Sequence, residues 1–133
     1  GTSLGEAHGT HIAGIISNVA PDAKIMPLQV FEYGKAYTSD VVAAIQYAEA
    51  HGADIVNCSW GNGNDNPILR ETIEASGMLF VAAVGNNSRS LDETPIYPAS
   101  YDLDNVISVA AVDSEGELGY FSNYGAAVDI GAW

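Results

Sequence analysis

Positively charged side chains are scarce in this sequence of 133 residues. It contains 4 Lys and Arg residues against 17 Asp and Glu residues, which gives a formal net charge of -13 at pH 7. A chain with this balance repels the phosphates of nucleic acids and the anionic head groups of lipids, so we expect neither a nucleic-acid partner nor a membrane partner. Long apolar runs are also missing, because none approaches the roughly 18 to 20 residues that a membrane-spanning helix needs.

Cysteine is nearly absent. The single Cys58 excludes an internal disulfide and leaves the redox compartment undetermined. It ends the apolar run Asp54-Ile55-Val56-Asn57-Cys58, where a free cysteine packs as a small hydrophobic residue more readily than it acts as a nucleophile. We assign it to the core.

Apolar runs of strand length are present, and they alternate with segments of helical period. This alternation predicts an α/β fold with three layers, in which a mostly parallel sheet is flanked by helices. The predicted strands are Ile25–Phe31, Ile55–Cys58, Leu79–Val84 and Val106–Val112. Pro27 supplies no donor to a sheet, so it indicates an edge position, a bulge or an irregular start for the first strand.

Two helices have clear boundaries in the sequence. One is predicted from about residue 39 to 51, with Gly52 as its C-terminal cap. The second begins at Pro67 with Asn66 as N-cap and stops at Gly77.

The segment from Gly85 to Asn105 lacks sustained periodicity and predicts a long ordered loop, a common place for functional residues. No repeat, low-complexity tract or linker divides the chain, so we interpret residues 1–133 as one domain. No strand precedes the first motif, and the chain stops directly after the strand-like Ala127–Ile130. We therefore expect a domain that is incomplete at both ends, which is completed by missing segments of its own or by another chain, or which tolerates the truncation.

The most informative motif is His8-Gly9-Thr10-His11-Ile12-Ala13-Gly14. It resembles the signature of the subtilisin-like serine proteases (subtilase, peptidase S8 family), which opens a helix and whose first histidine is the general base. The resemblance implies that His8 takes the proton of a serine hydroxyl and returns it to the leaving amine, a role that suits imidazole. His11 also matches a His-x-x-His metal spacing, but no acidic or cysteine ligand follows at a regular offset. We assign no metal and interpret His11 as a packed structural residue.

A second motif, Val81-Ala82-Ala83-Val84-Gly85-Asn86-Asn87, is an apolar strand that delivers an asparagine into a loop. It resembles the family's alanine-rich strand followed by glycine and asparagine. The resemblance implies that Asn86 donates a hydrogen bond to the oxyanion of the tetrahedral intermediate, and that Ala83 and Gly85 contact substrate. Taken without the resemblance, the Gly-Asn-Asn sequence is an ordinary turn.

Two further segments resemble substrate-binding parts of the family. Ser59-Trp60-Gly61 is similar to the segment whose backbone pairs with an extended substrate. Tyr97-Pro98-Ala99 is similar to the lining of the primary specificity pocket, where the Tyr-Pro bond can be cis. The alternative is that both segments are turns and that Trp60 is simply half-buried.

Two weaker features complete the resemblance. Phe121-Ser122-Asn123-Tyr124-Gly125 is similar to the family's later serine-rich turn. Calcium is common in the family, and the acidic residues of this chain offer a loose site as one reading. We prefer a solvated acidic face, formed by Asp92, Glu93, Asp102 and Asp104.

The family's catalytic residues follow the order aspartate, histidine, serine along the chain. Only seven residues precede His8, and no Gly-Thr-Ser-Met-Ala motif follows Asn86. Gly1-Thr2-Ser3 would be a nucleophile motif only in a circularly permuted arrangement, which we disfavour. We expect a chain that carries the histidine and the oxyanion asparagine, lacks the aspartate and the serine, and is inactive alone.

The function that the resemblance implies is a serine endopeptidase, which hydrolyses peptide bonds of a peptide or protein substrate through an acyl-enzyme. The alternative is a pseudoprotease, or another peptide-binding α/β module without catalysis. The sequence does not determine the compartment, although an acidic subtilase is compatible with secretion or with the cell envelope.

Overall fold

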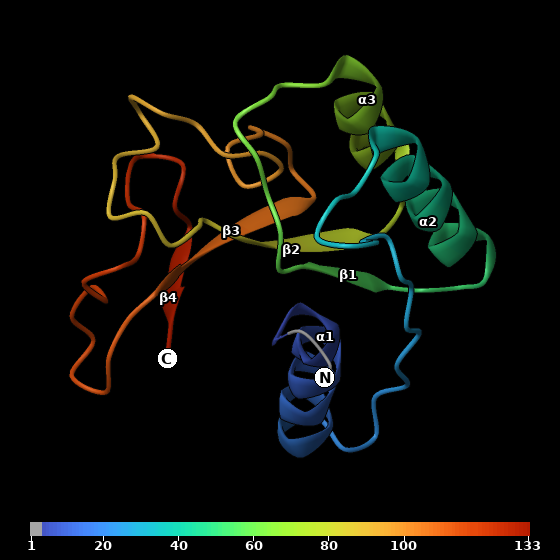
Figure 1. Cartoon of the computed structure of the whole chain (residues 1–133), viewed down its shortest axis with the longest axis horizontal. Helices are drawn as coiled ribbons and strands as arrows, with labels where there is room; N and C mark the ends of the chain where they lie inside the picture. The colour runs from blue at the N-terminus through green and yellow to red at the C-terminus, as the bar shows by residue number, and fades with distance from the viewer. Residues whose placement is uncertain (1–3) are drawn as a thin grey trace. The chain divides into compact units, whose positions relative to one another are not determined.

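The computed structural model describes residues 4–133, which form two compact units. The smaller unit extends to Ala44 and the larger one runs from Ile45 to Trp133 (Figure 1). Within the described residues, no helix has both the length and the apolar character needed to cross a membrane.

The smaller unit begins with helix α1, Leu4–Val19. His8 therefore lies in the second turn of this helix, whereas the resemblance placed its motif at a helix start. After α1 the chain runs without regular structure to a tight turn at Glu32–Lys35, which is closed by two main-chain hydrogen bonds of 2.8 and 3.0 Å.

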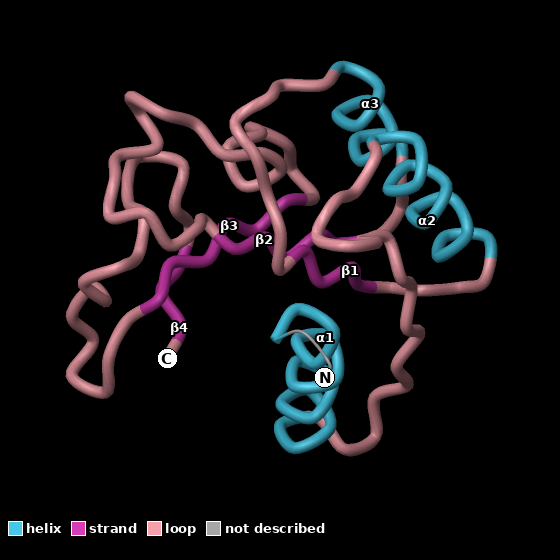
Figure 2. The backbone as a smooth tube through the Cα atoms, in the orientation of Figure 1, coloured by secondary structure: helices cyan, strands magenta, loops and turns pink. Residues whose placement is uncertain are grey.

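The strand predicted over Ile25–Phe31 is not formed, and the segment is an irregular loop (Figure 2). A strand needs a neighbouring strand to satisfy its main-chain donors and acceptors. None of the described residues pairs with this segment, and Pro27 has no donor to contribute. The prediction was wrong because apolar composition does not supply a pairing partner.

The larger unit is built on a sheet of four parallel strands in sequence order: β1 Ile55–Cys58, β2 Leu79–Ala83, β3 Val106–Ala111 and β4 Ile130–Ala132. The predicted α/β class and parallel sheet are confirmed. The first three of these strands match their predicted ranges to within a residue, whereas the last begins only at the end of the strand-like segment 127–130.

Burial alternates along the central strands. In β3, Val106, Ser108 and Ala110 are buried and the residues between them are half-buried. Phe80 and Ala82 occupy the buried positions of β2 and are fully inaccessible to solvent. One face of the sheet therefore forms the core of the larger unit.

Helix α2, Thr38–Ala50, spans the boundary between the two units and ends in a glycine cap. Gly52 has a φ of +79°, a left-handed conformation that glycine adopts without strain. The amide of Ala53 bonds to the carbonyl of Ala48 at 3.0 Å, and the amide of Gly52 bonds to that of Glu49 at 3.1 Å. This pair of bonds is a Schellman motif, so the predicted C-terminal cap is confirmed.

Helix α3, Pro67–Ala75, begins as its sequence predicts. The side-chain oxygen of Asn66 accepts hydrogen bonds from the amides of Ile68 at 3.0 Å and Leu69 at 3.2 Å, and Pro67 occupies the first helical position. The helix ends two residues before Gly77, because Ser76 has already taken an extended conformation.

Candidate active site

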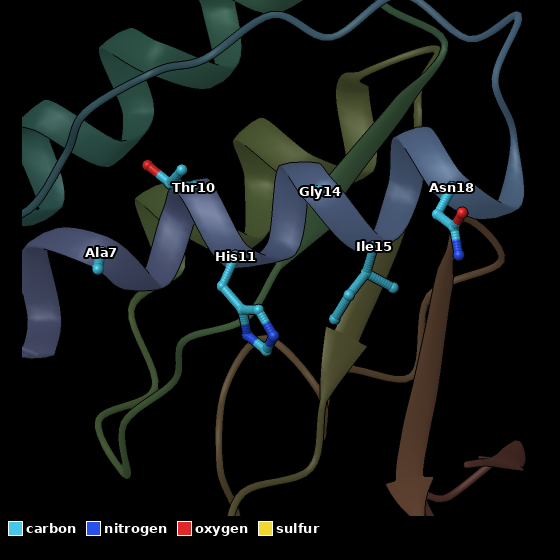
Figure 3. Close-up of a pocket in the computed structure, with 6 residues that line it drawn as sticks. All are labelled: Ala7, Thr10, His11, Gly14, Ile15 and Asn18. Atoms are coloured by element: carbon cyan, nitrogen blue, oxygen red, sulfur yellow. The ribbon is translucent and has the colours of Figure 1, made fainter.

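The two histidines of the N-terminal motif lie on α1, and both are exposed. His11 lines a shallow depression along the helix with neighbours that include Gly14 and Ile15. Figure 3 shows His11 and Ile15 on the same side of α1, with Thr10 pointing away from them. None of the described residues of the smaller unit covers His11, so its packing stays a prediction.

Among the described residues, no group of three or more His, Cys, Asp or Glu side chains could hold a metal ion. The side chain of Asp92 instead binds the main chain of its own unit, because its Oδ1 accepts a hydrogen bond from the amide of Ala126 at 2.9 Å. Glu93, Asp102 and Asp104 are exposed.

Asn86 lies in the larger unit, three residues beyond the end of β2. The hydrogen bond from the Val84 amide to the Val109 carbonyl, 3.1 Å long, continues the β2–β3 pairing by one residue. Gly85 then turns the chain with a φ of +99°. The side chain of Asn86 is exposed and has no hydrogen-bond partner among the described residues.

Asn123 supports the loop that carries Asn86. Its side chain is 0% exposed, and it bonds to the main chain on both sides of Asn86. Sequence reasoning placed Asn123 only in a turn and assigned it no role. The one signal available was its position in the Phe121–Gly125 motif, which does not show where the side chain points.

Ser59-Trp60-Gly61 follows β1 directly, so it leaves the sheet at the carboxyl end of that strand. Because β1 and β2 are parallel neighbours with Cys58 opposite Ala82, this segment lies at the same edge of the sheet as Asn86. Ligands of open α/β sheets bind at this edge. Ser59 is exposed, and its hydroxyl accepts a hydrogen bond from the side-chain Nδ2 of Asn57 at 2.8 Å. Trp60 is half-buried.

The Tyr97-Pro98-Ala99 segment lies against the chain just after Gly61. Asn62 and Tyr97 exchange two main-chain hydrogen bonds of 3.1 and 2.8 Å, which join the two candidate substrate-binding segments. A Cβ atom at Gly61 would lie 2.6 Å from the Cγ2 of Ile96 and 3.0 Å from the carbonyl oxygen of Tyr97, so only glycine permits this approach.

The rest of the segment is held firmly. The Tyr97–Pro98 peptide bond is cis, and the rings of Tyr97 and Tyr101 lie 4.6 Å apart. Pro98 and Ala99 are buried, and the hydroxyl of Ser108 donates a hydrogen bond to the carbonyl of Ala99. Tyr97 is half-buried and is thus the most accessible of the three proposed pocket residues.

Cys58 lies next to this edge but is not accessible. Its side chain is 0% exposed, and burial raises the pKa of its thiol from 9.0 to about 12. A thiol with such a pKa stays protonated and unreactive at neutral pH. The assignment of Cys58 to the core is confirmed.

A parallel α/β sheet of this kind places its ligand-binding loops at the carboxyl edge, and the same scaffold carries many unrelated activities. The chain belongs to the subtilase family, whose model (Peptidase_S8) matches residues 2–133.

Individual relatives agree with this assignment. Subtilisin DY of Bacillus licheniformis is 34% identical over 95% of this chain and 50% of its own length. A thermophilic serine proteinase of Bacillus sp. (strain AK1) is 38% identical over 92% of this chain and 33% of its own length. In the crystal structure of the psychrophilic subtilisin-like protease Apa1 from Pseudoalteromonas sp. AS-11, 77% of this chain superimposes on 24% of that protein, with a TM-score of 0.66 and 39% identity. The chain thus spans about half or less of the length of these relatives.

Proposed function

We propose that this chain supplies the general base and the oxyanion donor of a serine endopeptidase. His8 is the base and Asn86 is the donor. The observation that supports the proposal most directly is the exposed side-chain amide of Asn86. It has no hydrogen-bond partner among the described residues, and Asn86 lies at the same carboxyl edge of the sheet as Ser59-Trp60-Gly61. A donor without an internal partner is available to a substrate oxygen.

The chemistry is acyl transfer. The hydroxyl of a serine from the rest of the parent enzyme attacks the carbonyl carbon of the peptide bond, and the His8 imidazole accepts the hydroxyl proton. Negative charge then develops on the carbonyl oxygen, where the Asn86 amide donates a hydrogen bond that is stronger in the transition state than in the ground state. The protonated imidazole gives the proton to the departing amine. Water then attacks the acyl-enzyme, the imidazole accepts the proton of the water and returns it to the serine oxygen, and the acid is released.

The substrate in this proposal is a peptide or protein in extended form. The main chain of Ser59-Trp60-Gly61 pairs with it as a neighbouring strand would, and Trp60 forms a wall of the groove. The remaining pocket contacts come from Ala83, Gly85 and the Tyr97-Pro98-Ala99 segment. The hydrogen-bonded pair of Asn62 and Tyr97 supports this arrangement, because it holds the two binding segments together.

We also propose that residues 1–133 are part of one catalytic domain, whose aspartate and serine come from other parts of the parent protein. The 133-residue chain alone then hydrolyses no peptide ester, since a base and an oxyanion donor without a nucleophile cannot form an acyl-enzyme. Ester hydrolysis by the purified chain that a serine-directed phosphonate blocks would contradict this part of the proposal.

The decisive test uses the complete parent enzyme. We expect His8→Ala to lower kcat by about six orders of magnitude and Asn86→Ala by about 10²- to 10³-fold, the sizes of the effects of the corresponding changes in subtilisin. His11→Ala is the matched control on the same helix, and it should retain activity within a few-fold. Circular dichroism and size-exclusion chromatography confirm that each variant is folded. Full activity of the folded His8→Ala enzyme would refute the role of His8.

A further inference from the structure

Asn123 is a fully buried primary amide in the loop between β3 and β4. An amide taken out of water is costly unless its donors and acceptors are paired inside the protein. In this structure no buried side-chain nitrogen or oxygen of the described residues lacks a partner. The hydrogen-bond partners of Asn123 therefore indicate which part of the structure the buried side chain holds in place.

The partners of its side chain and of its main-chain amide all lie in one short segment, whereas its carbonyl accepts a hydrogen bond from the neighbouring Ser122 hydroxyl at 3.0 Å. The side-chain Nδ2 donates to the carbonyl of Val84 at 2.8 Å, and the side-chain Oδ1 accepts from the amides of Asn87 at 3.0 Å and Arg89 at 3.2 Å. The main-chain amide of Asn123 donates to the carbonyl of Gly85 at 2.9 Å. These bonds hold the main chain before and after Asn86, and none of them uses Asn86 itself.

The loop that carries Asn123 is itself anchored to the sheet. The hydroxyl of Ser122 accepts a hydrogen bond from the amide of Ala111, at the end of β3, at 3.0 Å. Two further hydrogen bonds join the two loops to each other. The amide of Ser88 donates to the carbonyl of Phe121 at 2.9 Å, and the hydroxyl of Ser88 donates to the carbonyl of Tyr120 at 2.7 Å. The segment Ser122-Asn123 thus connects the Asn86 loop to the end of strand β3.

We propose that Asn123 is the positioning residue for the oxyanion donor Asn86. This inference rests on the proposed function of Asn86. An oxyanion donor is effective only when it is held in place before charge develops, and a misplacement of about 1 Å can cost about 10²-fold in rate. The Asn86 side chain has no bond of its own to hold it, so its placement depends on the main chain that Asn123 fixes.

A double-mutant cycle in the complete parent enzyme tests the inference. Asn123→Ala should lower kcat at least about 10-fold with KM changed less than about twofold, because the donor acts on the transition state. If Asn123 acts through Asn86, adding Asn123→Ala to the Asn86→Ala enzyme should lower kcat by less than about threefold. This loss of effect is not expected of a residue that only stabilises the fold.

Asn105 offers a matched control at the other end of β3. Its side-chain amide donates to the carbonyls of Ile73 at 2.8 Å, Met78 at 3.1 Å and Ser76 at 3.3 Å, so it also fixes a turn of the main chain. Asn105→Ala should lower the melting temperature yet leave kcat within about twofold of the wild type.

The outcomes separate this inference from the proposed function. An unchanged kcat in Asn123→Ala, or an equal loss with and without Asn86, would overturn the positioning role while leaving Asn86 as the donor. An unchanged kcat in Asn86→Ala would overturn the proposed function and this inference with it. If Asn123→Ala does not fold, Asn123→Ser keeps a small polar side chain, buries no charge, cannot replace all three side-chain hydrogen bonds, and is judged by the same criteria.

Discussion

A Cβ atom at Gly85 would lie 2.7 Å from the side-chain Nδ2 of Asn123. The two residues are also joined by a hydrogen bond of 2.9 Å between their main chains. Position 85 therefore has no room for a side chain, and the glycine lets the loop approach the buried amide that supports it.

The first prediction concerns that glycine. Gly85→Ala should destabilise the parent enzyme by about 2 to 4 kcal/mol, because it adds a left-handed backbone strain of about 1 to 2 kcal/mol to a clash with Asn123. Urea unfolding in a His8→Ala background, which prevents self-digestion in our proposal, measures the change. Gly116→Ala is the control, since Gly116 has a φ of +83° with no neighbouring atom within 4 Å, so that strain alone applies. Equal losses at the two positions would show that the contact with Asn123 has no effect.

The second prediction concerns substrate binding at Gly61. Gly61→Ala should raise KM at least several-fold, because the new methyl group would push Ile96 and the Tyr97 carbonyl away from the Asn62 segment. Gly63→Ala is the matched control on the same loop, where the nearest atom would be 3.7 Å away in ordinary contact. Steady-state kinetics on a peptide substrate separate KM from kcat. A Gly61→Ala enzyme with an unchanged KM would argue against this loop as part of the substrate groove.

The third prediction concerns the N-cap of α3. Asn66→Ala removes the acceptor for the amides of Ile68 and Leu69 and should cost about 1 kcal/mol of stability. Asn64→Ala, an exposed change in the preceding loop, should cost less than about 0.5 kcal/mol. Urea unfolding of both variants gives the comparison, and a larger loss at position 64 than at position 66 would contradict the capping role.

The fourth prediction concerns Cys58. With its pKa raised to about 12 by burial, the thiol should resist iodoacetamide at pH 8 in the folded enzyme and react readily in guanidinium chloride. Mass spectrometry of the peptide that contains Cys58 measures the labelling. Rapid labelling of the folded enzyme would show that this part of the core opens to solvent.

The same thiol predicts a dependence of stability on pH. Its folded-state pKa lies above the ordinary value of 9.0, so the folded form keeps a proton that the unfolded form loses. The stability contributed by the protonated thiol is complete below about pH 9 and is lost as the pH rises toward about 12. Cys58→Ala should lack this part of the decline, which unfolding curves at pH 8 and pH 10.5 can measure.

Features that depend on neighbouring residues were predicted well. The N-cap at Asn66, the glycine cap at Gly52 and the strand Ile55–Cys58 all occur as expected. Each depends on contacts within a few residues or on a short apolar run between turn residues. The strand predicted over Ile25–Phe31 failed because a strand depends on a partner, which no local pattern contains.

The same distinction between local and long-range contacts applies to the candidate site. The sequence by itself determined the fold class, the family motifs and the position of Asn86 just after a strand, because each is encoded in short stretches of chain. Only the tertiary structure decided that Asn123 holds the Asn86 loop and that Gly61 lies against Ile96. These contacts join residues 34 or more positions apart. They exist because the parallel sheet returns distant loops to one edge, and hydrogen bonds there depend on the path of the whole chain.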